Sequence, residues 1–283
     1  MILLADGGST KIDWVFLEKG KLLKRIQTKG ANPFYRTSGD IAEELRVNLL
    51  PETNQLPIES VHFFGAGCAN PEKNEVIREA IRFSLGVDNI EVGSDLLGAA
   101  KALCGHRPGI ACILGTGSNS GYYDGKRLAD NVSPLGYILG DEGSGAVLGK
   151  LFVGACLKNQ FSPGLKEAFL TETGLTSVDI IERVYQGALP NRFLASFTPF
   201  IKRNLHDSDV YDLVAKSFED FFRRNVMQYD YQNHPIHFTG SVAFHFQVVL
   251  KEVADHLDLK IESIVASPME GLLSYYSSCF KYG

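Results

Sequence analysis

Two short glycine-rich segments of the sequence have the composition of phosphate-binding loops. Residues 6–11 read Asp-Gly-Gly-Ser-Thr-Lys, and residues 115–119 read Gly-Thr-Gly-Ser-Asn. Glycine lets the backbone come close to an anion, and successive loop N–H groups then point at it. Ser9 and Thr10 add hydroxyl donors, and Lys11 adds positive charge. An ordinary hairpin turn is the alternative for either segment, but two such loops together favour a clamp on a phosphate chain.

A carboxylate stands directly before the first of these loops. Asp6 follows the apolar run 2–5, which is typical of a short buried strand. A carboxylate in this place can hold Mg²⁺, often through water, so we predict a metal site at Asp6. The GxxxxGK[ST] spacing of a Walker A loop is missing, and an apolar strand at 12–17 rather than a helix follows the loop. The sequence therefore predicts neither a P-loop nor a dinucleotide-binding fingerprint.

A second carboxylate lies at the predicted start of a helix. Asp95 follows Ser94, which is expected to cap a helix that extends to Leu103. The positive end of the helix dipole favours a carboxylate, so we expect Asp95 to stay ionised. An ionised carboxylate can accept the proton of an acceptor hydroxyl in phosphoryl transfer. Helix capping without catalysis is the alternative.

Two further glycine-containing segments precede predicted helices. Residues 140–145 read Gly-Asp-Glu-Gly-Ser-Gly, and their two acids could hydrogen-bond sugar hydroxyls or order a metal ion; simple helix capping is the alternative. Residues 240–242, Gly-Ser-Val, lie at a predicted junction of strand and helix. Glycine there permits the close approach of an adenosine, and the start of a helix is electropositive.

The elements that position these groups occur twice in the same order: a strand, a glycine loop, a second strand and a turn. Gly8 corresponds to Gly117, and Ser9 corresponds to Ser118. The first copy comprises 2–5, 6–11, 12–17 and 19–21, and the second comprises 109–114, 115–120, 121–123 and 124–126. This self-similarity predicts an α/β protein with two related lobes rather than one continuous sheet.

The chain after the second copy is predicted to be mostly helical between 144 and 230. Its aromatic-rich stretches, 193–201 and 218–231, have helical spacing without interleaved basic residues, which indicates core packing. One amphipathic helix is expected at 242–257, between two short strands, and another at 268–280.

Composition narrows the class of protein further. The 283 residues have a net charge of −5 and no run of like charge, so a nucleic-acid partner is not expected. No leader peptide or stretch of ~20 apolar residues is present, so we expect no membrane span and a cytoplasmic protein. The 5 cysteines include no CxxC pair, which favours a reducing compartment over a zinc site.

The chain resembles the BadF/BadG/BcrA/BcrD ATPase family of the actin/hexokinase/heat-shock-70 superfamily, to which N-acetylglucosamine kinases belong. The resemblance covers nearly the whole chain and rests on four motifs in the family's order, at residues 6–11, 115–119, 140–144 and 240–242. It implies two ribonuclease-H-like lobes, an actin-like ATPase fold, with ATP, Mg²⁺ and substrate in a central cleft. The ROK sugar kinases, with their zinc cluster of closely spaced cysteines, resemble the chain less.

The resemblance also implies residue roles. Asp95 aligns with the catalytic base of the amino-sugar kinases. The residues that match nucleotide-binding positions are Gly8, Ser9, Thr10, Lys11, Thr116, Gly117, Ser118, Gly240 and Ser241. The residues that match substrate contacts are Asn32, Asp95, Thr116, Gly117, Asn119 and Asp141. The stretch around Cys68 departs from a serine-containing pattern of animal amino-sugar kinases, so the resemblance is weaker for the exact sugar.

We accordingly expect an ATP-dependent kinase that phosphorylates an amino sugar, N-acetylglucosamine at its 6-hydroxyl. The alternatives are a glucosamine or other hexose kinase, an ATPase of the dehydratase-activator type that drives a partner protein, and a non-catalytic sensor. The expected lobes are residues 1–104 and 105–270, with a C-terminal helix at 271–283 that packs back on the first lobe. Family analogy favours a homodimer.

Overall fold

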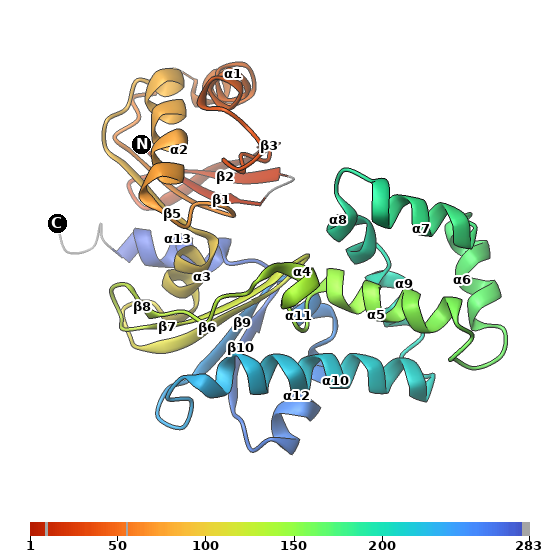
Figure 1. Ribbon diagram of the computed structural model, residues 1–283. Coiled ribbons are helices and arrows are strands. Elements are labelled where there is room, and N and C mark those ends of the chain that lie inside the picture. Colours follow the sequence, from red (N-terminus) through yellow and green to blue (C-terminus); the bar gives the residue numbers. More distant parts are fainter. Residues whose placement is uncertain (9–10, 55, 279–283) are drawn as a thin grey trace. The chain divides into compact units, whose positions relative to one another are not determined.

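The computed structural model describes residues 1–8, 11–54 and 56–278 (Figure 1). By contacts the chain divides into two compact units, Met1–His106 with Pro268–Gly283 and Arg107–Ser267. Each unit is built on one five-stranded sheet flanked by helices, which confirms the predicted α/β class with two related lobes. No helix in the described part of the chain is long and apolar enough to cross a membrane.

The sheet of the first unit has the order β3-β2-β1-β4-β5. Its strands are β1 (Ile2–Gly7), β2 (Lys11–Glu18), β3 (Lys21–Lys29), β4 (Ser60–Gly65) and β5 (Ile90–Ser94). The first three strands form an antiparallel meander, while β4 and β5 run parallel to β1. The helical elements of this unit are α1 (Ser38–Asn48), η1 (Leu50–Thr53), α2 (Pro71–Leu85), α3 (Asp95–Cys104) and α13 (Met269–Ser278).

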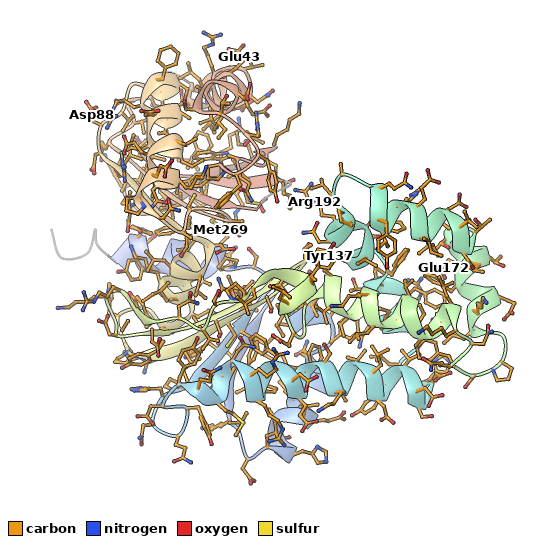
Figure 2. The ribbon with its side chains drawn as sticks, in the orientation of Figure 1. Glu43, Asp88, Tyr137, Glu172, Arg192 and Met269 are labelled. Carbon is orange, nitrogen blue, oxygen red and sulfur yellow. The ribbon has the colours of Figure 1, made fainter. Side chains whose placement is uncertain are left out.

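Alternate side chains of these strands enter two different cores, as the period-2 geometry of a strand requires. On one face, Trp14 and Phe63 belong to the core that also contains residues of α1 and α2. On the other face, Leu4 and Phe64 pack with Leu272 of α13. Charged side chains outside the strands project into solvent instead. Glu43 and Asp88 of the first unit and Glu172 of the second are examples (Figure 2).

The sheet of the second unit repeats the same topology. Its strands are β6 (Gly109–Leu114), β7 (Ser118–Tyr123), β8 (Leu128–Asp130), β9 (Ile236–Thr239) and β10 (Ile261–Val265), and their order is β10-β9-β6-β7-β8. Again three strands form an antiparallel meander, and the fourth and fifth are parallel to the first. The internal repeat predicted from sequence is therefore confirmed at the level of strand order and direction.

The boundaries of several elements differ from the predictions. In the first hairpin, Asp6 and Gly7 belong to β1 and Lys11 belongs to β2, rather than to the predicted loop 6–11. Ser118, Asn119 and Ser120 belong to β7 rather than to the glycine loop, because they pair in register with β6 and leave only residues 115–117 in the turn. The helix expected at 242–257 is broken at Phe246.

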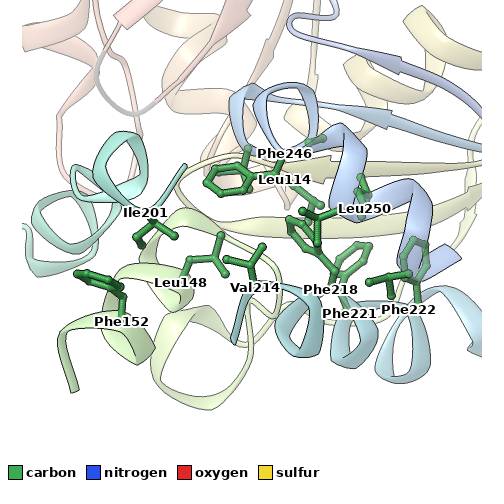
Figure 3. Close-up of a cluster of buried hydrophobic side chains, with 14 of the residues drawn as sticks. Leu114, Leu148, Phe152, Ile201, Val214, Phe218, Phe221, Phe222, Phe246 and Leu250 are labelled. Atoms are coloured by element: carbon green, nitrogen blue, oxygen red, sulfur yellow. The ribbon is translucent and has the colours of Figure 1, made fainter. Parts of the chain in front are cut away.

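Helices fill the long connection between β8 and β9. The helical elements of this unit are α4 (Gly136–Leu139), α5 (Gly145–Leu157), α6 (Leu165–Thr173), α7 (Ser177–Gln186), α8 (Pro190–Ala195), α9 (Thr198–Arg203), α10 (Ser208–Arg224), η2 (Val226–Gln228), α11 (Ser241–His245) and α12 (Gln247–His256). Phe218 and Phe222 of α10 are fully buried with Phe246 in one core (Figure 3). The aromatic stretch 218–231 thus contributes to the core, as predicted.

Candidate active site

The carboxyl ends of three parallel strands bring the candidate residues of the first unit together. Gly7 of β1 pairs with Gly65 of β4, which in turn pairs with Ser94 of β5. The chain that continues from each strand therefore leaves from the same edge of the sheet, where open α/β sheets bind ligands. Asp6 and Asp95 consequently flank this edge, one on each side of β4.

The β1–β2 hairpin carries two opposed carboxylates. Asp6 pairs directly with Asp13 across the antiparallel ladder, so both side chains lie on the same face of the sheet. The Gly8 N–H donates to the Lys11 carbonyl at 2.9 Å and closes the hairpin, and Lys11 Nζ lies 3.5 Å from Asp13. Ser9 and Thr10, predicted to bind phosphate, lie outside the described residues.

Asp13 was not identified from sequence. The signal was present, however, because a hairpin closed at 6–11 places residue 13 opposite residue 6. Burial, followed by the charges of Asp13 and Asp95, raises the pKa of Asp6 to about 7, while Lys11 opposes the rise. An acidic oxygen donor in an environment short of positive charge is suited to a hard cation such as Mg²⁺.

The chemistry of these donors therefore fits Mg²⁺. Within the described residues, no group of three or more His, Cys, Asp or Glu side chains could hold a metal ion. Mg²⁺ usually keeps several waters and binds one or two carboxylates together with substrate phosphates. Asp6 meets that requirement without further protein ligands.

Asp95 is fixed by the start of α3. Ser94 is the N-cap and accepts a hydrogen bond from the Leu97 N–H at 3.1 Å, as its sequence position predicted. The Leu96 N–H donates to Asp95 Oδ1 at 2.8 Å. Burial nevertheless raises the pKa of Asp95 above its ordinary value, against these backbone hydrogen bonds. Desolvation therefore outweighs these backbone hydrogen bonds, and the raised pKa makes the carboxylate a stronger base.

Asn32 and Cys68 lie in loops beside this edge. The Phe34 N–H donates to Asn32 Oδ1 at 3.0 Å, and a Cβ on Gly67 would collide with that same oxygen. Burial, with a further contribution from Asp95, raises the pKa of the Cys68 thiol to about 12. The thiol is therefore an inert neighbour of Asp95 rather than a nucleophile.

In the second unit, the loop after β6 is hydrogen-bonded to the start of α5. The Gly145 N–H donates to the Gly115 carbonyl at 2.8 Å, and the Ala146 N–H donates to the Thr116 carbonyl at 3.0 Å. The Gly115 N–H donates to the Gly117 carbonyl at 2.9 Å. These bonds give the glycine turn a defined backbone shape before any ligand binds.

Asp141 lies directly against this turn. A Cβ on Gly117 would lie 3.1 Å from Asp141 Oδ2, and the Ser118 N–H hydrogen-bonds the carboxylate. Burial raises the pKa of Asp141 to about 6; Ser118 and Lys150 oppose the rise, and Glu142 adds to it. The structure therefore brings Gly117, Ser118 and Asp141 together, although 23 positions separate Asp141 from Ser118 in the sequence.

The neighbouring acid has a different role from the one expected. Glu142 is 8% exposed, forms an ion pair with Arg224, and accepts a hydrogen bond from Asn225 Nδ2 at 3.3 Å. The Gly143 N–H donates to Ser217 Oγ at 3.1 Å. Glu142 therefore ties the loop to α10, and only Asp141 of the pair lies against the glycine turn.

The remaining predicted residues lie at the same edge of the second sheet. Gly240 has φ +114°, and a Cβ there would collide with the carbonyl of Leu114, the residue before the glycine turn. Ser241 begins α11. Asn119 Oδ1 accepts hydrogen bonds from the Ser120 N–H and from Asn131 Nδ2, both at 3.0 Å.

Two units that repeat one five-stranded topology, each with a glycine hairpin at the ligand-binding edge of its sheet, define the two-lobed actin-like ATPase fold. No protein-family model matches the chain, and no curated protein matches its sequence. A solved structure from Porphyromonas gingivalis, described as a "putative N-acetylglucosamine kinase", matches with a TM-score of 0.95 and 54% identity over 98% of this chain and 99% of that chain. The protein belongs to the same family as this relative.

More distant structures share the fold alone. A protein from Chromobacterium violaceum with the same description matches with a TM-score of 0.72 and 18% identity, over 97% of this chain and 98% of that chain. A ROK family glucokinase from Streptomyces griseus, in complex with glucose and AMPPNP, matches with a TM-score of 0.60 and 15% identity, over 99% and 100% of the two chains.

Proposed function

We propose that this protein is an ATP-dependent kinase that phosphorylates N-acetylglucosamine at its 6-hydroxyl. The observation that carries the proposal is the carboxylate pair of the first unit. Asp95 is held by the first turn of α3 with a raised pKa, and its charge also raises the pKa of Asp6 at the adjacent hairpin. A base and a metal-binding carboxylate beside one glycine loop are the groups that phosphoryl transfer requires.

In this proposal Asp95 takes the proton of the acceptor hydroxyl. Asp6 would hold Mg²⁺, which would supply the positive charge that the terminal phosphates need. In the first unit, Gly8 and Lys11 are phosphate contacts and Asn32 is a sugar contact. In the second unit, Thr116, Gly117 and Ser118 are phosphate contacts, and Gly240 and Ser241 are adenosine contacts. Asn119 and Asp141 of the second unit are sugar contacts, together with Thr116 and Gly117.

The comparisons support a sugar kinase in two ways. The relative with 54% identity carries a description as an N-acetylglucosamine kinase, and the Streptomyces griseus enzyme was solved with a hexose and an ATP analogue. The four ordered motifs support membership of the BadF/BadG/BcrA/BcrD family. We propose a cytoplasmic location, which the absence of a CxxC pair from the sequence favours; the cysteines Cys68, Cys104, Cys112 and Cys156 are buried.

The experiment is a screen of ATP consumption with N-acetylglucosamine, glucosamine, N-acetylmannosamine, glucose and no sugar. We expect ADP release to depend on sugar and to be fastest with N-acetylglucosamine. A faster reaction with glucosamine or glucose would reassign the substrate. Turnover that is independent of sugar would instead favour an ATPase that drives a partner protein.

Asp95→Asn tests the base directly. We expect kcat to fall by about 10²–10⁴-fold, the usual contribution of a general base, while ATP affinity measured by calorimetry stays within about twofold. Asp88→Asn is the matched control, because the Asp88 side chain is 92% exposed, and it should retain full activity. Wild-type turnover in Asp95→Asn would remove Asp95 from the role.

A further inference from the structure

A partly buried polar cluster outside the candidate active site joins three elements of the first unit. Lys101 of α3 is 7% exposed, and its Nζ forms an ion pair with Glu91 of β5. Lys101 Nζ also donates to the Tyr276 hydroxyl of α13 at 3.1 Å, and that hydroxyl donates to Glu91 Oε2 at 2.6 Å. Each of the three side chains therefore contacts the other two.

A neighbouring histidine, His62, is a further contact of the Glu91 carboxylate. His62 Nδ1 lies 2.7 Å from Glu91 Oε2, and its ring centroid lies 4.2 Å from that of Tyr276. Burial alone would raise the pKa of Glu91, but hydrogen bonds from His62, Lys101 and Tyr276 outweigh it and lower the pKa to about 2. The low pKa keeps Glu91 ionised at neutral pH, as its ion pair with Lys101 requires.

The position of this pair in the chain gives it a specific consequence. Glu91 lies on β5, before Asp95 in the chain, and Lys101 lies on α3, after Asp95. The ion pair between them therefore spans the corner between strand and helix. Asp95 lies at the vertex of that corner. The ion pair therefore restrains the angle at which α3 leaves β5.

The inside of the corner is closely packed around one aromatic ring. A Cβ on Gly98 would collide with Phe64, and a Cβ on Gly93 would lie 3.1 Å from the same ring, so strand and helix both approach this ring through glycine. Lys101 Nζ lies 5.0 Å from the centroid of the same ring. Apolar residues of α3 such as Leu97 pack against this core, and the polar cluster adds the directional hydrogen bonds that fix the orientation of the helix.

The Lys101 side chain is 9% exposed, whereas the Glu91 side chain is 35% exposed. Desolvation of the lysine charge offsets much of its Coulomb attraction to Glu91, and an apolar side chain of similar volume is often equally stable at such a place. Stability alone therefore does not account for a charge here, whereas positional specificity does. We propose that Lys101, Glu91 and Tyr276 are positioning residues that set the orientation of Asp95 at the start of α3. This proposal rests on the role of Asp95 as the catalytic base.

The test is Lys101→Met, which keeps the length of the side chain and removes its charge. We expect kcat to fall by about 10–100-fold, because a misplacement of ~1 Å at a reacting group can cost ~10²-fold, while KM for ATP and for the sugar changes by less than about threefold. The pH profile of kcat should shift as well, since a looser corner changes the solvent exposure and the charged surroundings of Asp95. Asp6 and Cys68, the titratable groups that interact with Asp95, are unchanged in this variant.

Lys101→Arg should recover most of the lost kcat, because it restores a charged donor to Glu91. Tyr276→Phe keeps the ring and removes only the hydroxyl, so it should fold normally and lower kcat about 3–10-fold in the same direction. It also keeps the proposal testable if Lys101→Met fails to fold. Lys24→Met is the matched control, since Lys24 pairs with Glu52 at a half-exposed site of the same unit, and its kcat should not change.

Two results would overturn the proposal: a wild-type kcat and pH profile in Tyr276→Phe, or a Lys101→Met protein whose melting temperature falls while its kcat and pH profile do not change. Parallel measurement of Asp95→Asn separates this failure from that of the proposed function. An inactive Asp95→Asn together with normal Lys101 and Tyr276 variants would contradict only the positioning role. An active Asp95→Asn would contradict the base itself.

Discussion

The β1–β2 and β6–β7 hairpins occupy equivalent places in two sheets of one topology, but they present different chemistry. The first hairpin carries opposed carboxylates, Asp6 and Asp13, whose mutual repulsion and burial call for a cation. The second carries a turn whose carbonyls are bonded to Gly145 and Ala146 at the start of α5. A repeated scaffold has thus been specialised, one copy through side-chain charge and the other through backbone shape.

The connections that follow the hairpins differ in the same way. Between β3 and β4 the first unit has α1 and the short η1, whereas the second unit has α4 to α10 and η2 between β8 and β9. The larger connection supplies both Asp141, which lies against the turn, and Arg224, which fixes the loop through Glu142. The glycine turn of the β6–β7 hairpin therefore depends on distant helices, while the carboxylates of the β1–β2 hairpin depend mainly on their own strands.

The largest effect expected from this contrast concerns Asp6. Asp6→Asn should lower kcat by about 10²–10³-fold, because a carboxylate that holds the metal contributes several kcal/mol of charge stabilisation in the transition state. Initial rates over a Mg²⁺ titration measure it. Asp13→Asn removes only a neighbouring charge and should cost about tenfold or less. Equal losses in both variants would contradict the assignment of the metal to Asp6.

The glycine turn of the β6–β7 hairpin should be sensitive to shape instead of charge. Gly240→Ala should lower the free energy of unfolding by about 2–4 kcal/mol, because alanine is strained at φ +114° and its Cβ would collide with the Leu114 carbonyl. Urea denaturation measures this change. Gly154→Ala is the control, since Gly154 lies in α5 with no atom within 4 Å of the added carbon, and it should be neutral or stabilising by up to ~1 kcal/mol. Equal stability of the two variants would show that the close approach at Gly240 is dispensable.

The smallest effect expected is a dependence of stability on pH. The pKa values of about 7 for Asp6 and about 6 for Asp141 lie above those of unfolded carboxyl groups. Between about pH 4 and 7 the folded state therefore binds more protons than the unfolded state, and these groups make stability fall as pH rises.

Asp6→Asn should weaken the decrease in stability that wild type shows as pH rises. The melting temperature of Asp6→Asn minus that of wild type should therefore increase from pH 5 to pH 8. The corresponding free-energy difference is on the order of 2 kcal/mol. Scanning calorimetry over this range measures it, with the exposed Asp88→Asn as the control. Parallel curves for wild type and Asp6→Asn would show that the pKa of Asp6 is not raised.

The features that could be predicted from sequence were those with local causes. The cap at Ser94 forms between residues three positions apart. The glycine turns and the alternating apolar strands likewise follow from neighbouring residues, and the repeat of strand and turn was sufficient to predict two related lobes. The loop before Ser118 was predicted too long because polar residues can also pair in a strand when the opposite strand is in register.

The tertiary structure decided the electrostatics and the distant contacts. Strand pairing places Asp13 opposite Asp6. Glu142 forms an ion pair with Arg224. Tyr276, near the other end of the chain, donates a hydrogen bond to Glu91. The pKa of Asp95 depended on burial, which outweighed the backbone hydrogen bonds at the start of α3. Propensities and caps act between residues that are close along the chain, whereas desolvation and ion pairing depend on which segments fold against each other, and only the packed structure determines that.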